Sequence, residues 1–145
     1  MDIIKILLAT LVGTSVMTAF SYIVSEAFNK LFKEPVLLEY MMKLLHLDLS
    51  PRMRSVCGWL VHYIIGLLFV IAYDILWNKF DIEVSLQSAL LFGAASGIIG
   101  ILGWMIIFRI PSKEPRVHFK GYYLQLFFAH IIFALGAWGV YELYQ

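Results

Sequence analysis

The sequence predicts an all-α integral membrane protein, a single transmembrane domain over 1–145 built as a bundle of four transmembrane helices. Composition is the first reason. Of the 145 residues, 61% are hydrophobic and only 14% are charged, whereas soluble domains are roughly half apolar and about a quarter charged. The second reason is the presence of four apolar stretches, each with the roughly 20 residues that a helix needs to cross the hydrocarbon core. The third is the concentration of positive charge in two of the linkers between them.

The four crossings are expected at about 3–28, 51–77, 84–108 and 121–143. The second crossing has a clear start, because Ser50 and Pro51 are residue types favoured at the N-cap and at the first helical position. Pro111 and Pro115 follow the third crossing, and proline cannot continue a helix.

A further helix is predicted over 35–48, between the first two crossings. This segment begins with a proline and is too short to span a membrane. Glu39, Lys43 and His46 recur at helical spacing and form a polar stripe on an otherwise apolar segment. Such a pattern is typical of an amphipathic helix that lies in the membrane interface.

The lysines and arginines predict the orientation of the chain. Nine of the eleven basic residues lie in or beside two linkers, the one between the first and second crossings and the one between the third and fourth. They are Lys30, Lys33, Lys43, Arg52, Arg54, Arg109, Lys113, Arg116 and Lys120. By the positive-inside rule both linkers are cytoplasmic and both termini are non-cytoplasmic. The net charge of +1 gives no indication of a nucleic-acid partner.

Two short patterns occur twice and predict a duplicated helical hairpin. The tripeptide at 33–35 recurs at 113–115 as Lys-Glu-Pro. His62 precedes Tyr73-Asp74 by the same spacing with which His130 precedes Tyr141-Glu142. Because each copy contains two crossings, the copies would be related by a pseudo-two-fold axis along the membrane normal.

His62 and His130 are the candidate functional residues, because an ionisable side chain within a crossing is costly unless it has a partner or a role. Each lies 12 residues before an acidic residue at the outer end of its crossing, roughly 18 Å along a helix. The two imidazoles are therefore expected at a common depth near the middle of the bilayer.

Three interpretations of the histidine pair remain open. In the first, each ring forms an interhelical hydrogen bond to a backbone carbonyl or to Ser15, Thr18 or Ser96. In the second, the rings are the axial ligands of a b-type haem. The small residues that would leave space for this ligand are Gly66, Ala134, Gly13 and Gly93. In the third, the pair belongs to a metal or proton path, which requires an oligomer because zinc and copper take three or four ligands.

The third crossing also carries a face of small residues, formed by Gly93, Gly97 and Gly100. Such a face lets another helix approach closely. It predicts a tight contact within the bundle or, as the alternative, a homodimer through this face.

Around Trp59, His62, Tyr63 and Gly66 the sequence resembles small four-pass bacterial membrane families of unknown function. The resemblance implies a location in the bacterial inner membrane and no particular activity. Common enzyme motifs such as G-x-S-x-G, H-E-x-x-H and the phosphate-binding loop do not occur.

The leading functional hypothesis from the sequence is a membrane-embedded binding module in which His62 and His130 hold a b-type haem or a similar ligand, for electron transfer or sensing. The alternatives are a structural or accessory subunit that binds a protein partner without a cofactor, and a small oligomeric transporter.

Overall fold

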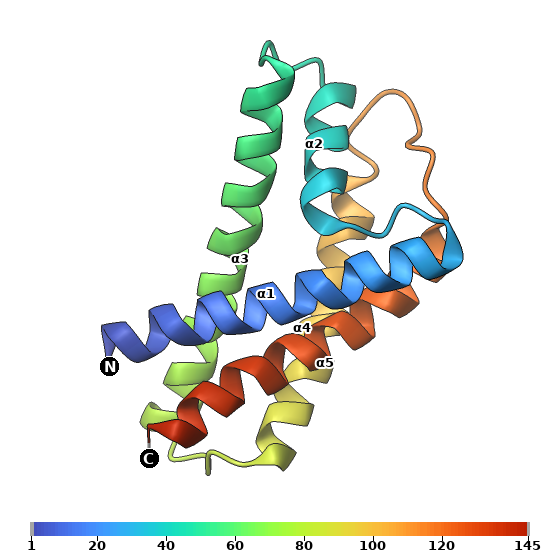
Figure 1. Cartoon of the computed structure of the whole chain (residues 1–145). Coiled ribbons are helices and arrows are strands. Elements are labelled where there is room, and N and C mark those ends of the chain that lie inside the picture. The colour runs from blue at the N-terminus through green and yellow to red at the C-terminus, as the bar shows by residue number, and fades with distance from the viewer. Residues whose placement is uncertain (1, 145) are drawn as a thin grey trace.

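The computed structural model describes residues 2–144, and this range folds into helices without any strand. The helices are α1 (Ile3–Phe28), α2 (Glu34–Leu44), α3 (Pro51–Lys79), α4 (Leu86–Ile107) and α5 (Phe119–Leu143), as Figure 1 shows. Within the described residues, α1, α3, α4 and α5 are each long and apolar enough to span a membrane. The prediction of an all-α chain with four candidate spans is therefore confirmed.

Serine caps determine where two of the spanning helices begin. Ser50 caps α3 by accepting a hydrogen bond from the Met53 backbone N–H at 3.3 Å. Ser85 and Ser88 form a capping box, so α4 begins at Leu86, two residues after the expected start. The bounds of the spanning helices differ from the expected ranges by at most two residues.

α5 is at the centre of the helix packing, because it lies along both α1 and α4. α3 packs on α1 and α2, and it meets α4 through long side chains rather than through close backbones. Tyr73 of α3 hydrogen-bonds Ser96 of α4 with 2.6 Å between the oxygens, and the Trp77 indole N–H donates to Ser88 at 2.9 Å. Figure 1 shows α1 and α5 side by side, both inclined to the more upright α3 and α4.

The duplicated hairpin is not evident in this packing. A two-fold axis that relates the copies would make α3 pack on α4 as closely as α5 packs on α1. Of these two helix pairs, only α1 and α5 have close backbones. The two copies of the His-Tyr-acid pattern also make different contacts. Tyr73 bonds Ser96, whereas the Tyr141 hydroxyl donates to Asp74 at 2.8 Å. The duplication stays a prediction from the sequence matches.

α2 is shorter than expected and turns one face toward the interior. It ends at Leu44 rather than at 48, since His46 adopts a left-handed backbone conformation with φ of 54°. Glu34 and Pro35 at its start are buried. Gly58 of α3 allows this close approach, because a Cβ at that position would lie 2.6 Å from the Pro35 carbonyl oxygen. The interfacial position of α2 stays a prediction.

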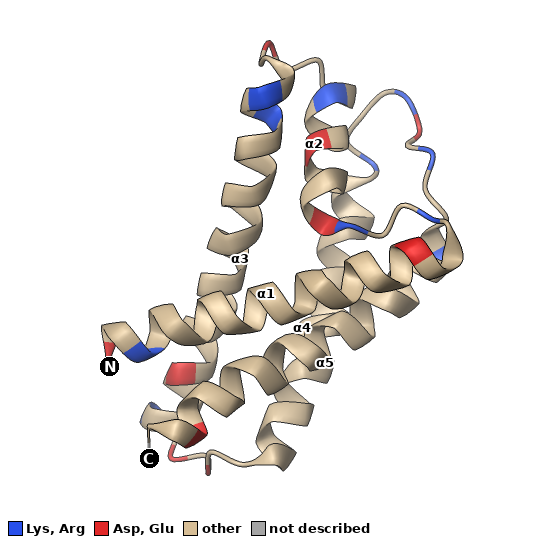
Figure 2. Ribbon diagram, viewed as in Figure 1, with Lys and Arg blue, Asp and Glu red and all other residues tan. Residues whose placement is uncertain are grey.

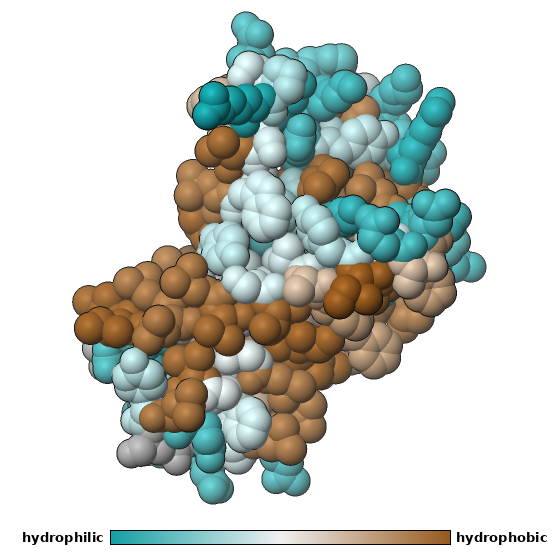
Figure 3. Space-filling model, in the orientation of Figure 1, coloured by the Kyte–Doolittle hydropathy of each residue, from teal (hydrophilic) through white to brown (hydrophobic). Residues whose placement is uncertain are grey.

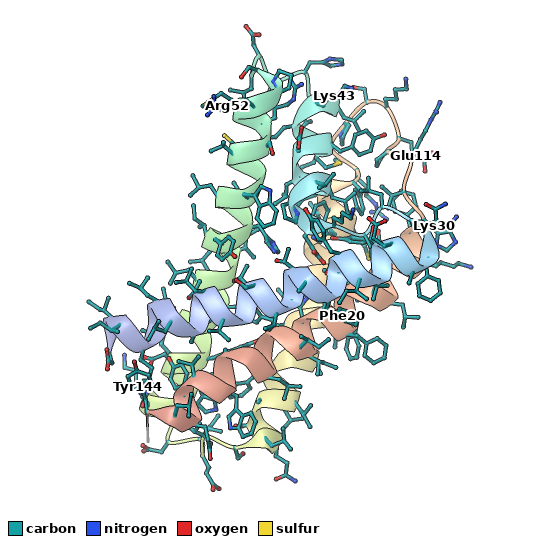
Figure 4. All side chains as sticks on the ribbon, viewed as in Figure 1. Phe20, Lys30, Lys43, Arg52, Glu114 and Tyr144 are labelled. Atoms are coloured by element: carbon teal, nitrogen blue, oxygen red, sulfur yellow. The ribbon has the colours of Figure 1, made fainter. Side chains whose placement is uncertain are left out.

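The surface is apolar over the spans, and most of the basic residues lie at one end (Figure 2). Large side chains such as Leu68 and Leu91 are exposed, and Figure 3 shows hydrophobic surface over α1. Basic residues gather around α2, the start of α3 and the α4–α5 linker, while both termini lie away from that end (Figures 1 and 2). Figure 4 shows Lys43 and Arg52 at this basic end and Tyr144 at the opposite end. Such a surface fits a multi-pass protein whose helices contact a lipid bilayer.

Candidate functional site

His62 lies on α3 with 6% of its surface exposed and bonds a neighbouring helix. Its Nε2 is 2.9 Å from the Thr18 hydroxyl oxygen of α1. The Thr18 hydroxyl donates its own hydrogen to the Thr14 carbonyl at 2.6 Å, so the oxygen of Thr18 accepts from His62 Nε2–H. In a neutral imidazole the other ring nitrogen, Nδ1, is then an acceptor. Of the hydrogen-bond partners considered from the sequence, Thr18 is the one that His62 bonds.

His130 lies on α5 with 5% of its surface exposed and bonds its own helix. Its Nδ1 is 2.9 Å from the Leu126 carbonyl oxygen. A carbonyl oxygen only accepts, so Nδ1 carries the proton and Nε2 is left as an acceptor. The ring packs edge-on against Phe69 of α3, with 5.4 Å between the ring centroids. Ser15 and Ser96 are not partners of either histidine, because they bond Tyr63 and Tyr73.

The two histidines line one cavity. Its volume is about 210 Å³, and it lies where α3 and α4 are held apart by their side chains. His62 and Gly66 of α3 form part of its wall, together with Gly100 of α4 and His130 of α5. The structure therefore brings the two candidate residues to a common site, although each already has a hydrogen-bond partner.

Glu34, at the start of α2, lines the same cavity. Only 2% of its surface is exposed. Its Oε1 accepts from the Ser21 hydroxyl of α1 at 2.6 Å and from the Gln125 side-chain amide of α5 at 3.4 Å. The same amide donates to the Ser21 oxygen at 2.5 Å. A carboxyl group from α2 thus joins α1 and α5 at one wall of the cavity.

Burial dominates the electrostatics of this carboxyl group. It raises the pKa of Glu34 from its ordinary value of 4.5 to about 7, because desolvation disfavours the charged form. The hydrogen bonds from Ser21 and Gln125 act in the opposite direction and do not compensate. Near neutral pH, Glu34 is therefore poised between its neutral and its charged form.

A carboxyl group at this position was not expected from the sequence, which predicted 35–48 as an interfacial helix. The missed signal was the pair Ser21 and Gln125, two polar side chains within crossings that need a buried partner. Asp74, expected near the outer end of its crossing, is also engaged in buried contacts. It is buried and accepts from Tyr141 and from the Asn78 side-chain amide, each at 2.8 Å.

The small residues expected to leave space for a ligand mostly allow neighbouring helices to approach closely. A Cβ at Gly66 would meet the Thr14 side chain of α1, and one at Gly13 would lie 2.9 Å from the Phe133 carbonyl oxygen. Ala134 is fully buried and packs beside Gly93. Of these four positions, only Gly66 lines the cavity.

The glycine face of α4 is turned toward α5. A Cβ at Gly93 would lie 2.7 Å from the Ile131 Cα, and one at Gly97 would lie 3.0 Å from the Phe127 ring. A Cβ at Gly100 would lie 2.6 Å from the His130 ring. All three glycines are thus used within the chain, so a homodimer through this face finds no support in this geometry.

The cavity does not fit a haem in this conformation. Its volume is below the roughly 300–1,000 Å³ of typical small-ligand sites. His62 Nε2 is engaged by Thr18.

Comparison of the chain with protein-family models, with curated proteins and with solved structures finds no match. What the cavity does must therefore be inferred from its own geometry and chemistry.

Proposed function

We propose that this protein is a membrane-embedded binding module that takes a small, largely apolar ligand into the cavity between α3 and α4. The observation that carries the proposal is a single cavity with apolar walls, into which three buried ionisable side chains from three helices converge. A few polar groups in an otherwise apolar pocket are typical of sites that orient a small ligand.

Entry from the lipid supports this proposal. Ile65 of α3 and Ile99 of α4 belong to the cavity wall, yet they are 38% and 58% exposed on the apolar outer surface. The backbones of α3 and α4 are not closely packed at this place. A hydrophobic molecule dissolved in acyl chains could reach the cavity between these helices without passing through water.

The charge distribution supports an orientation for the module. We place the basic end, which carries Lys43 and Arg52, on the cytoplasmic side of a bacterial inner membrane, with both termini on the other side. In this orientation α2 lies at the cytoplasmic interface while its first residue, Glu34, reaches the cavity.

Filling the cavity tests the binding function. Gly103 lines the cavity, and a Cβ at this position would meet no atom within 4 Å. We expect Gly103→Leu to lower the affinity for a small aromatic probe, para-fluorophenethyl alcohol, by about tenfold or more, corresponding to about 1.4 kcal/mol. Fluorine NMR of the protein in lipid nanodiscs separates bound probe from probe in the bilayer.

The matched control is Gly139→Leu on α5, where an added Cβ also meets nothing within 4 Å and the cavity is not affected. This variant should bind the probe as the wild type does. Equal affinity of the wild type and Gly103→Leu, or no bound signal in the wild type, would contradict a binding function for this cavity.

Haem remains a second candidate because His62 and His130 line one cavity. Binding it would require both rings to turn from their present partners and the cavity to widen. If the cavity binds a small apolar ligand and not haem, protein purified from haem-supplemented cells should be colourless. A Soret band that His62→Ala and His130→Ala each remove would instead establish the haem function.

A further inference from the structure

We infer that the ligand of this cavity carries a compact cationic group, such as a protonated amine, with Glu34 as its counter-charge. This inference rests on the proposed binding function and specifies the chemical class of the ligand.

The free polar atoms of the cavity are mainly acceptors. Glu34 Oε2 and Thr14 Oγ1 are buried without any hydrogen-bond partner, and both residues line the cavity. The Thr14 hydroxyl can accept a hydrogen bond as well as donate one. The hydrogen bonds of the two imidazoles leave His62 Nδ1 and His130 Nε2 as acceptors. An ammonium group carries three N–H donors and no acceptor, and therefore complements this set.

The charge of Glu34 is not balanced within the protein. The only ion pair in the described part of the chain joins Lys33 to Glu26, with 2.5 Å between Nζ and Oε1, so the basic neighbour of Glu34 is directed elsewhere. The titratable groups that face Glu34 are His62 of α3 together with Tyr122 and His130 of α5. α1 and α4 present no charged group to it. A carboxylate in such surroundings is costly unless it is paired.

The aromatic walls of the cavity complement the apolar part of such a ligand. Phe69, Trp104 and Phe133 line the cavity, and their rings can receive an apolar body as well as the edge of a cationic head. A volume of about 210 Å³ limits the ligand to a compact molecule such as an arylalkylamine.

Proton exchange is a necessary consequence of this pairing. Because burial raises the pKa of Glu34 to about 7, an entering cation displaces a proton from the fraction of molecules in which the carboxyl is neutral. The bound state then holds an ammonium–carboxylate pair, and the displaced proton is released to solvent.

The test compares two probes that differ only in the polar head, para-fluorophenethylamine and para-fluorophenethyl alcohol, by fluorine NMR in nanodiscs of uncharged lipid. We expect wild-type protein at pH 8 to bind the amine more tightly than the alcohol. Between pH 6 and pH 8 its affinity for the amine should rise about tenfold, following the ionised fraction of Glu34, while the affinity for the alcohol stays constant.

Glu34→Gln keeps the shape of the side chain and removes its charge. In this variant the affinity for the amine should fall by about tenfold or more at pH 8, and the alcohol should still bind, which also shows that the cavity has formed. A second measurement needs only the wild type. In weakly buffered solution at pH 7, binding of the amine should release about half a proton per ligand.

The outcomes separate the two proposals. Equal binding of amine and alcohol by the wild type, without proton release, would overturn the cationic ligand and leave the binding module standing. Binding of neither probe would overturn both.

Discussion

Replacing Glu34 with glutamine should make the protein more stable at pH 8 by about 3 kcal/mol, relative to the difference between variant and wild type at pH 4.5. The pKa of Glu34 is raised to about 7 in the folded protein from an ordinary value of 4.5. Each pKa unit corresponds to about 1.4 kcal/mol, so the shift amounts to about 3 kcal/mol.

The direction of the change in stability with pH follows from whether the folded or the unfolded chain holds the proton of Glu34. Below about pH 4.5 the carboxyl is protonated in both the folded and the unfolded chain, and its contribution to stability is fully present. Between pH 4.5 and 7 only the folded chain keeps the proton, so stability falls as the pH rises and levels off above about pH 8. Glutamine has no carboxyl proton to release. The variant therefore does not lose stability over this pH range through residue 34.

The measurement is the free energy of unfolding by denaturant titration in mixed micelles, at several pH values for both proteins. Subtracting the two curves removes the contribution of the other titrating groups, because both proteins share them. Parallel curves for the wild type and Glu34→Gln would show that the carboxyl is not buried as the structure places it.

Replacing Gly93 with alanine should destabilise the protein by about 1 to 3 kcal/mol, which is the usual cost of overpacking a close contact. The added Cβ would lie 2.7 Å from the Ile131 Cα and 3.1 Å from both the Ala134 Cβ and the His130 carbonyl oxygen. Most of these atoms belong to the backbone of α5 and cannot move aside like the end of a flexible side chain. The backbones of α4 and α5 must therefore shift apart at this point.

Gly103→Ala is the matched control on the same helix, because a Cβ at that position meets nothing within 4 Å. It should be neutral or slightly stabilising, since alanine is the better helix former by about 1 kcal/mol. Unfolding midpoints of the two variants in the same detergent give the comparison. Equal midpoints would show that α4 and α5 do not approach each other as closely as the structure has them.

The proposed pairing of Glu34 with a cation links the stability prediction to function. A buried carboxyl that destabilises the unliganded protein at neutral pH is a cost, and a ligand that pairs with it recovers part of that free energy on binding. Stability and binding thus respond to the same side chain in opposite ways, which is a common relation at functional sites.

Two aspects of this protein are readable from its sequence. The four candidate spans follow from local hydrophobicity, because each crossing must by itself bury about 20 residues in an apolar medium. The start of α3 follows from its cap, because Ser50 acts on a backbone group only a few residues away. Signals of this kind are carried by neighbouring residues and need no partner.

The cavity and its carboxyl group depend on the tertiary structure. The pattern of Glu39, Lys43 and His46 predicts a polar stripe on the segment that contains α2. It contains no information on how Glu34 meets Ser21 and Gln125, which are 13 and 91 residues away in the chain. That contact forms only when α2 packs on α3 and α1 lies along α5. The sequence by itself determined which segments can cross a membrane. The packing of those segments decided which polar groups share the interior, because a buried polar group is stabilised by whichever partner the packing brings within reach.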